Sequence, residues 1–255
     1  EEMSAEWTKK FDHQTKMVGT GLEGPDEVSY IATDKEITVY KTSDGSIVWS
    51  NRYKELVPQL RKVDAFAPFW ASDAIFLFDK KMGKDKLAVV DLNDGKVLWE
   101  SSVYQGLTNQ NITYVAEKDG FILSLAGNIT FVDARTGEEK WETTLFKGSI
   151  ATSKYVDGDL VAMNVSPSGL KGLFKGFKNQ IVRMDLETGD IKWSQSYVGL
   201  PGYKVVTGEP TFRMNIEEDK VFVIMNGLQV FDVNTGATLW GATFTSDFVS
   251  HSSGV

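Results

Sequence analysis

The stretch "DARTGEEKW", Asp133 to Trp141, occurs five times in this chain with small variations. The other copies are "KTSDGSIVW" at 41–49, "DLNDGKVLW" at 91–99, "DLETGDIKW" at 185–193 and "DVNTGATLW" at 232–240. Every copy has a Gly followed four residues later by Trp, and successive glycines lie 50, 42, 52 and 47 residues apart. A period of about 40–50 residues is typical of the blades of a β-propeller.

The repeated residues form three sets. The aspartates are Asp91, Asp133, Asp185 and Asp232; the glycines are Gly45, Gly95, Gly137, Gly189 and Gly236; the tryptophans are Trp7, Trp49, Trp99, Trp141, Trp193 and Trp240. An Asp at the start of a tight turn accepts hydrogen bonds from backbone N–H groups two residues on, and Gly supplies the positive φ of a hairpin bulge. An indole at the same place in each unit packs between neighbouring blades with its N–H on a backbone acceptor. We therefore expect all three sets to be structural.

Functional interpretations of the same residues are less favoured. Calcium ligation by the aspartates is disfavoured because "DLNDGK" at 91–96 lacks the distal Glu of a calcium loop. Stacking of a sugar or cofactor on the tryptophans is disfavoured because an asymmetric site has no use for the same residue in every unit. The two histidines, His13 and His251, have no convergent partners in the sequence. The sequence therefore predicts no catalytic, cofactor-binding or metal-ligating residue.

Short apolar strands fill each unit ahead of its turn. One set is "EVSYIA", "AIFLF", "GFILSLA", "DLVAMNV" and "KVFVIM", and the next is "ITVYK", "LAVVD", "ITFVD", "IVRMD" and "LQVFD". Residues 87–90 are apolar on both faces, whereas a sheet with one wet face would alternate. Covered faces on short antiparallel strands predict an all-β fold, a β-propeller of four-stranded antiparallel blades. A β-sandwich is the alternative, but it does not explain a unit of about 45 residues.

An apolar residue four positions after each Trp extends the pattern, and the spacing predicts that it shares a strand face with the Trp. These residues are Tyr53, Val103, Leu145, Tyr197 and Phe244. Trp7 and Phe11 give the N-terminus the same signature. We therefore expect about five complete blades plus an N-terminal closing strand. They would form a single propeller domain, residues 1–255, that is incomplete at the C-terminus and belongs to a propeller of about 7–8 blades.

The motif D-x-x-T-G-x-x-x-W, repeated in register, resembles the PQQ-type (pyrroloquinoline-quinone) propeller repeat, often called the tryptophan docking motif. The resemblance covers five units, residues 28–245, and the segment at Trp7. It implies one of two branches. The first is the quinoprotein dehydrogenases, with PQQ and a calcium ion. The second is non-catalytic and includes the BamB-like lipoproteins of the bacterial outer-membrane assembly machinery, sensor domains of some kinases and other secreted proteins.

The absence of Cys favours the non-catalytic branch. Dehydrogenases of this family commonly place a disulfide between adjacent cysteines against the quinone, and this chain cannot form one. The resemblance then implies a protein-interaction scaffold with no cofactor, in the periplasm or at the cell surface of a bacterium. A lipid anchor ahead of the given residues would tether it to a membrane. The alternatives are a fragment of a PQQ- and calcium-dependent dehydrogenase, or a propeller that binds a carbohydrate or small ligand at its axis.

The composition excludes some partners. The formal net charge of −8 argues against nucleic acid, which requires a concentrated basic face. No run approaches the roughly 18–20 apolar residues of a membrane span. The composition is that of a globular protein, with 42% hydrophobic and 24% charged residues.

One stretch interrupts the repeat. Between two strand sequences that other units join by a short turn, this chain has "SPSGLKGLFKGFKN" at 166–179. Its apolar and basic residues are Leu170, Lys171, Leu173, Phe174, Lys175, Phe177 and Lys178. Such an insertion on a loop predicts a surface that docks a protein partner or touches a membrane. The alternative is a hairpin extension whose Leu and Phe side chains fold back over their own blade.

Overall fold

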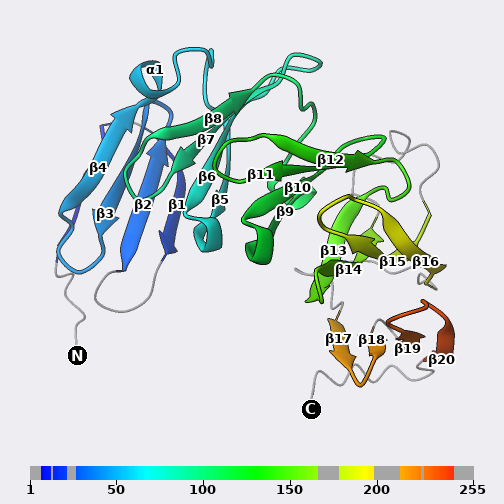
Figure 1. The fold of residues 1–255 in the computed structure, drawn as a ribbon. Coiled ribbons are helices and arrows are strands. Elements are labelled where there is room, and N and C mark those ends of the chain that lie inside the picture. The colour runs from blue at the N-terminus through cyan, green and yellow to red at the C-terminus, as the bar shows by residue number, and fades with distance from the viewer. Residues whose placement is uncertain are drawn as a thin grey trace, which may run out of the picture. The chain divides into compact units, whose positions relative to one another are not determined.

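The computed structural model describes residues 7–12, 14–21, 27–165, 178–197, 213–224 and 227–243. Within them the chain forms five four-stranded sheets, each built from four strands consecutive in the sequence (Figure 1). The one α-helix of the described residues, α1, has a single turn, Tyr53–Leu56. The predicted all-β fold with four-stranded antiparallel blades is therefore confirmed.

The first three sheets each take their four strands in chain order. Sheet 1 contains β1 (Thr15–Gly21), β2 (Val28–Thr33), β3 (Glu36–Lys41) and β4 (Ile47–Arg52). Sheet 2 contains β5 (Ala65–Phe69), β6 (Ala74–Asp79), β7 (Lys86–Asp91) and β8 (Val97–Ser101). Sheet 3 contains β9 (Ile112–Val115), β10 (Gly120–Ser124), β11 (Ile129–Asp133) and β12 (Glu139–Thr143). Short 3-10 helices, η2 (Trp70–Ser72), η3 (Asn109–Asn111) and η4 (Ala116–Lys118), lie in the connections.

The last two sheets have the same order. Sheet 4 contains β13 (Ser149–Val156), β14 (Asp159–Val165), β15 (Gln180–Asp185) and β16 (Ile191–Ser196). Sheet 5 contains β17 (Arg213–Glu217), β18 (Lys220–Ile224), β19 (Gly227–Asp232) and β20 (Thr238–Thr243). The chain divides into two compact units: the first comprises Glu1–Leu123 and Val132–Glu139, and the second comprises Ser124–Phe131 and Lys140–Val255.

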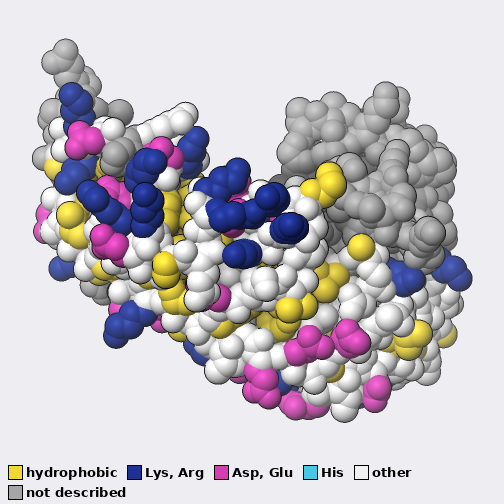
Figure 2. Space-filling view, turned by 90° about the horizontal axis from the view of Figure 1, so that it is seen from above, with side chains coloured by type: hydrophobic (Ala, Val, Ile, Leu, Met, Phe, Trp, Pro, Cys, Tyr) yellow, Lys and Arg dark blue, Asp and Glu magenta, His cyan; other side chains and the backbone are white. Residues whose placement is uncertain are grey.

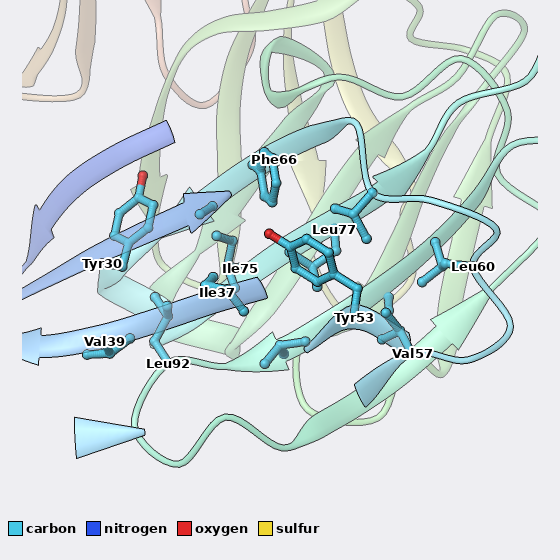
Figure 3. Packing of buried hydrophobic residues seen from close by; sticks show 14 of the residues in the cluster. Tyr30, Ile37, Val39, Tyr53, Val57, Leu60, Phe66, Ile75, Leu77 and Leu92 are labelled. Atoms are coloured by element: carbon cyan, nitrogen blue, oxygen red, sulfur yellow. The ribbon is translucent and has the colours of Figure 1, made fainter. Parts of the chain in front are cut away.

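The core of the first unit lies between sheets 1 and 2 (Figure 3). Ile37 of β3 and Ile75 of β6 are fully buried there, together with Val57 from the segment after α1. Every residue of β6 is buried, as expected for a strand whose two faces are both covered. Burial of each such side chain contributes about 1.5–3 kcal/mol. In the second unit, Val161, Trp193 and Phe231 belong to a corresponding cluster.

The residues four positions after Trp divide into two groups. Tyr53 and Tyr197 are buried, and their hydroxyl groups donate to the carbonyl oxygens of Thr33 and Asn164. The same prediction is wrong for Val103 and Leu145, which are 77% and 67% exposed. Strands β8 and β12 end two residues earlier, at Ser101 and Thr143, so the strand period no longer applies there.

Residues 7–12, expected as part of a closing strand, take part in no strand ladder within the described residues. Trp7 nevertheless contacts the turn of sheet 1, through a hydrogen bond from its indole N–H to Thr42 and a close approach of its ring to Gly45. Phe244 and the C-terminal residues beyond 243 lie outside the described ranges.

Candidate functional site

The repeated aspartates hold the turns between the third and fourth strands of their sheets. In sheet 3, Asp133 Oδ1 accepts hydrogen bonds from the backbone N–H groups of Arg135 and Thr136, both at 2.9 Å. Asp185 and Asp232 accept the corresponding pairs in sheets 4 and 5. At Asp232, the N–H of Thr235 is the main cause that lowers the pKa of the carboxyl group. In each of these three carboxylates, Oδ1 therefore accepts two backbone N–H groups of its own turn.

Among the described residues, five of the six tryptophans of the repeat bond to the turn of the sheet that follows them in the chain. The acceptor is always the carbonyl oxygen of the residue directly after the leading position of that turn. The pairs are Trp7 with Thr42 (2.9 Å), Trp49 with Leu92 (2.8 Å), Trp99 with Ala134 (3.1 Å), Trp141 with Leu186 (2.8 Å) and Trp193 with Val233 (2.8 Å). The same residue also donates its own backbone N–H to a carbonyl in the turn between the first two strands of its sheet. In sheet 2, the N–H of Leu92 donates to the carbonyl of Asp73. The backbone of one residue, here Leu92, thus joins the Trp of the preceding sheet and two turns of its own sheet.

The repeated glycines face the rings of these tryptophans. Gly137 has φ +70°, and a Cβ built on it would lie 2.4 Å from Cδ2 of Trp99. The other four glycines of the repeat have φ between +70° and +76° and a Trp ring within 2.7 Å of the same position. Sequence reasoning found the need for a positive φ but missed the ring contact. Each Trp lies 38, 46, 38, 48 or 43 residues before the Gly that it contacts, so the contact is not visible as a local motif.

Trp240 differs from the other tryptophans of the repeat. It is 53% exposed, and its indole N–H forms no hydrogen bond within the described residues. Leu239 beside it is 49% exposed. The regular contact is therefore observed for Trp7, Trp49, Trp99, Trp141 and Trp193 only.

No metal-ligating cluster occurs in the part of the chain that the structure describes, where no group of three or more His, Cys, Asp or Glu side chains converges. His13 and His251 lie outside that part. Among the described residues, no helix is long and apolar enough to span a membrane.

The opposite edge of sheet 2 carries a different kind of surface, which we call the basic rim and define as residues 52–65 and 79–86. The first segment contains α1 and leads from β4 to β5, and the second is the turn from β6 to β7. Arg61 joins them: its Nε and Nη2 bond to the two carboxylate oxygens of the fully buried Asp79, each at 2.9 Å. The backbone N–H of Arg61 donates to the same carboxylate at 2.8 Å.

Asp85 fastens the β6–β7 turn to the next connection. Its carboxylate accepts the backbone N–H of Lys81 at 2.8 Å and that of Gly106 at 2.9 Å. Lys80 Nζ lies 3.4 Å from the same group and also donates to the carbonyl of Leu107. The amide of Gln105 bonds to both backbone groups of Asp85. The turn is thereby fixed at both ends.

Both carboxyl groups have a lowered pKa. Burial alone would raise the pKa of Asp79, but the hydrogen bonds and positive charge of Arg61 outweigh it. For Asp85, burial is likewise outweighed, here by the N–H groups of Gly106 and Lys81 and by Lys80. Sequence reasoning did not find these pairs, because Arg61 and Asp79 lie 18 residues apart outside the repeat.

The predicted interaction segment lies almost wholly outside the described residues. Of its seven apolar and basic residues only Lys178 is described; the other six, Leu170, Lys171, Leu173, Phe174, Lys175 and Phe177, lie outside. The strands that it connects are joined by Asn164, which is fully buried. Asn164 Nδ2 donates to the carbonyls of Lys147 and Lys178, each at 2.7 Å, and Oδ1 accepts the N–H of Gln180.

The five sheets and their turns define a class, the propellers of the PQQ-type repeat. The family described as "Outer membrane protein assembly factor BamB" matches residues 4–120 and, in a second overlapping match, 84–253. The chain therefore belongs to this BamB-like family of PQQ-type repeats. No curated protein sequence matches it.

Solved structures with the same fold are distant in sequence. BamB from Moraxella catarrhalis is 16% identical, with a TM-score of 0.51 over 88% of this chain and 63% of that one. Sqt1 from Saccharomyces cerevisiae is 14% identical, with a TM-score of 0.53 over 86% of this chain and 60% of that one. A europium-containing methanol dehydrogenase is 14% identical, with a TM-score of 0.51 over 89% and 50%. The chain spans between half and two thirds of the length of these proteins, and the likeness shows the fold.

Replacement of Gly137 by Ala tests the ring contact. Gly83 is the matched control, because its φ of +69° is nearly the same and nothing lies within 4 Å of a Cβ there. We expect Gly83→Ala to cost about 1–2 kcal/mol from the left-handed backbone alone. Gly137→Ala should cost roughly 2–3 kcal/mol more, since the methyl group overlaps the Trp99 ring. Urea denaturation followed by circular dichroism measures both, and equal losses would show that the ring contact has no energetic weight.

Asp79→Asn tests the anchor of the basic rim. Because the folded-state pKa of Asp79 is lowered, its contribution to stability is complete above the unfolded value of about 4 and is lost as the pH falls through the folded value. We expect Asp79→Asn to lower the free energy of unfolding at pH 7 by about 2 kcal/mol. The variant should also flatten its decline between about pH 5 and pH 2.

The control for this test is the exposed Glu117 of η4, whose replacement by Gln should change stability by less than about 0.5 kcal/mol. An unchanged pH profile in Asp79→Asn would contradict the account of this ion pair.

Proposed function

We propose that this protein is a non-catalytic propeller that acts as a protein-interaction scaffold in a bacterial cell envelope, as a component of an outer-membrane assembly machinery. One observation supports the proposal most strongly: the polar groups of the repeat form hydrogen bonds to the backbone that hold the turns and join neighbouring sheets. The Asp carboxylates accept turn N–H groups, and the indole N–H groups reach backbone carbonyls. These repeated groups offer no reactive centre, which leaves function to the connections.

Two further points support this assignment. The chain belongs to the family described as an outer-membrane assembly factor. Its connections between sheets also vary in length and sequence while the blades keep one plan, as expected where a rigid scaffold presents variable loops. The proposed location is the periplasm, with a lipid anchor as tether. The proposed function requires no cofactor.

The segment between β14 and β15 is the first part of this surface to test. Its ends are held by Asn164 through Lys178 and Gln180, so a shortened connection can close on the same anchors. We expect deletion of 168–177 to leave the circular dichroism spectrum and melting temperature unchanged. The deletion should abolish photo-crosslinking to outer-membrane assembly proteins in envelope preparations, as identified by mass spectrometry.

The double replacement of Asp94 and Lys96 by Ala, in the exposed turn of sheet 2, is the control and should crosslink like the wild type. Unchanged crosslinking after the deletion would remove this segment from the interface. Titration with PQQ and calcium, followed by absorbance and a dye-linked alcohol assay, tests the dehydrogenase alternative. Binding with turnover would overturn the scaffold proposal, and no binding is the expected result.

A further inference from the structure

In the first unit, one edge of sheet 2 and the opposite edge of sheets 1 to 3 carry opposite charge. The basic rim, residues 52–65 and 79–86, holds eight Lys and Arg against four Asp and Glu, a net of +4 in a chain of −8. The five turns at the other edge that lie wholly within the described residues hold four Lys and Arg against nine Asp and Glu. These turns are 41–47, 69–74, 91–97, 115–120 and 133–139. Figure 2, seen from the side on which α1 lies in Figure 1, shows Lys and Arg side chains gathered on that face.

The outward part of the basic rim keeps the full net charge of +4, because the two buried acids are matched by two cations that bond to them. Of its four acidic residues, Asp79 and Asp85 are buried and hold the backbone of the rim in place. Their partners Arg61 and Lys80 are the basic residues engaged inward. The remaining exposed cations are Arg52, Lys54, Lys62, Lys81 and Lys84. Of these, Lys62 pairs with Asp64 at 2.8 Å, and the half-buried Lys86 donates to the Gln59 carbonyl.

An apolar side chain stands at the tip of this surface. Met82, in "KKMGKDK" at 80–86, is 100% exposed between Lys81 and Lys84. Val103, in the connection that Asp85 ties to this turn, is 77% exposed. Because its side chain is fully exposed, Met82 buries no apolar surface in the folded chain and adds nothing to its stability. It forms a convex apolar tip flanked by Lys81 and Lys84.

We infer that the basic rim binds the surface of an anionic phospholipid bilayer. Lys54, Lys62, Lys81 and Lys84 would contact lipid phosphates, and Met82 would enter the boundary between headgroups and acyl chains. The convex tip distinguishes this partner from an acidic peptide, which binds in a groove lined by its ligands. The hollow next to the rim, of about 310 Å³, is lined by Glu100 as well as Lys86, so it does not favour an anionic chain.

The backbone of the basic rim is held in place before binding. Arg61 with Asp79, and Asp85 with Gly106, fix both segments before any lipid arrives, so little conformational freedom is lost on contact. The acidic turns at the other edge would then face away from the membrane. This inference rests on the first unit alone and is independent of the proposed scaffold function.

Sedimentation with vesicles tests the inference on the intact chain. We expect binding to equimolar phosphatidylglycerol and phosphatidylcholine vesicles and none to phosphatidylcholine alone. Each cation at the surface is worth about fivefold in partitioning, so Lys81→Glu/Lys84→Glu should weaken binding at least about 25-fold. The control, Lys41→Glu/Lys96→Glu, changes the net charge equally at the acidic edge and should bind like the wild type. Equal loss in both variants would reduce the effect to net charge and overturn the inference.

A labelled cysteine locates the contact. The chain has no Cys, so Met82→Cys gives one site for an environment-sensitive dye, and Asn93→Cys in the exposed turn of sheet 2 is its control. A blue shift on anionic vesicles is expected at position 82 only. Raising NaCl from about 0.1 M to about 1 M should release the protein, since the Debye length falls from about 10 Å to about 3 Å. No shift at position 82, or a shift produced equally by soluble poly-glutamate, would contradict a bilayer as the partner.

Discussion

The hydrogen bond from an indole N–H to the backbone of the next sheet is the contact on which this structure depends. An isolated four-stranded sheet leaves apolar residues on both faces, so it is stable only against neighbours. The bond from Trp141 to Leu186 and the stacking of its ring on Gly189 fix where the neighbour lies. The acceptor residue Leu186 is in turn held by its own N–H, which donates to the carbonyl of Gly158. Each sheet therefore positions the next through one tryptophan.

Much of this fold is readable from the sequence, and the reason is repetition. A single "DARTGEEKW" predicts a turn; five copies at blade spacing predict the sheet order, the covered strand faces and the backbone acceptor for each indole. Outside the repeat, the sequence predicts the structure less well. Val103 and Leu145 stand at the right spacing from Trp but lie beyond the ends of β8 and β12, and strand ends depend on pairing that spacing does not encode.

The candidate surfaces were less predictable for a related reason. The positive charge of residues 79–86 is visible in the sequence. How much of that charge faces solvent depends on which acidic residues are buried, and contacts between distant segments decide which ones are. Arg61 reaches Asp79, and Asp85 reaches Gly106, across stretches with no common pattern. Asn164 likewise is one polar residue in an apolar strand, and only the fold brings Lys147 and Lys178 to its side chain. The repeat builds the scaffold, and function is left to the connections.

Hydrogen exchange of the seven indole N–H groups tests the central claim most directly. Trp49, Trp99, Trp141 and Trp193 are buried with backbone acceptors, whereas Trp240 is 53% exposed. If these bonds hold the sheets together, the four buried indole protons exchange only when the sheets separate, with protection approaching the free energy of global unfolding. The proton of Trp240 should exchange at nearly the rate of free indole. Fast exchange of all five would contradict the account.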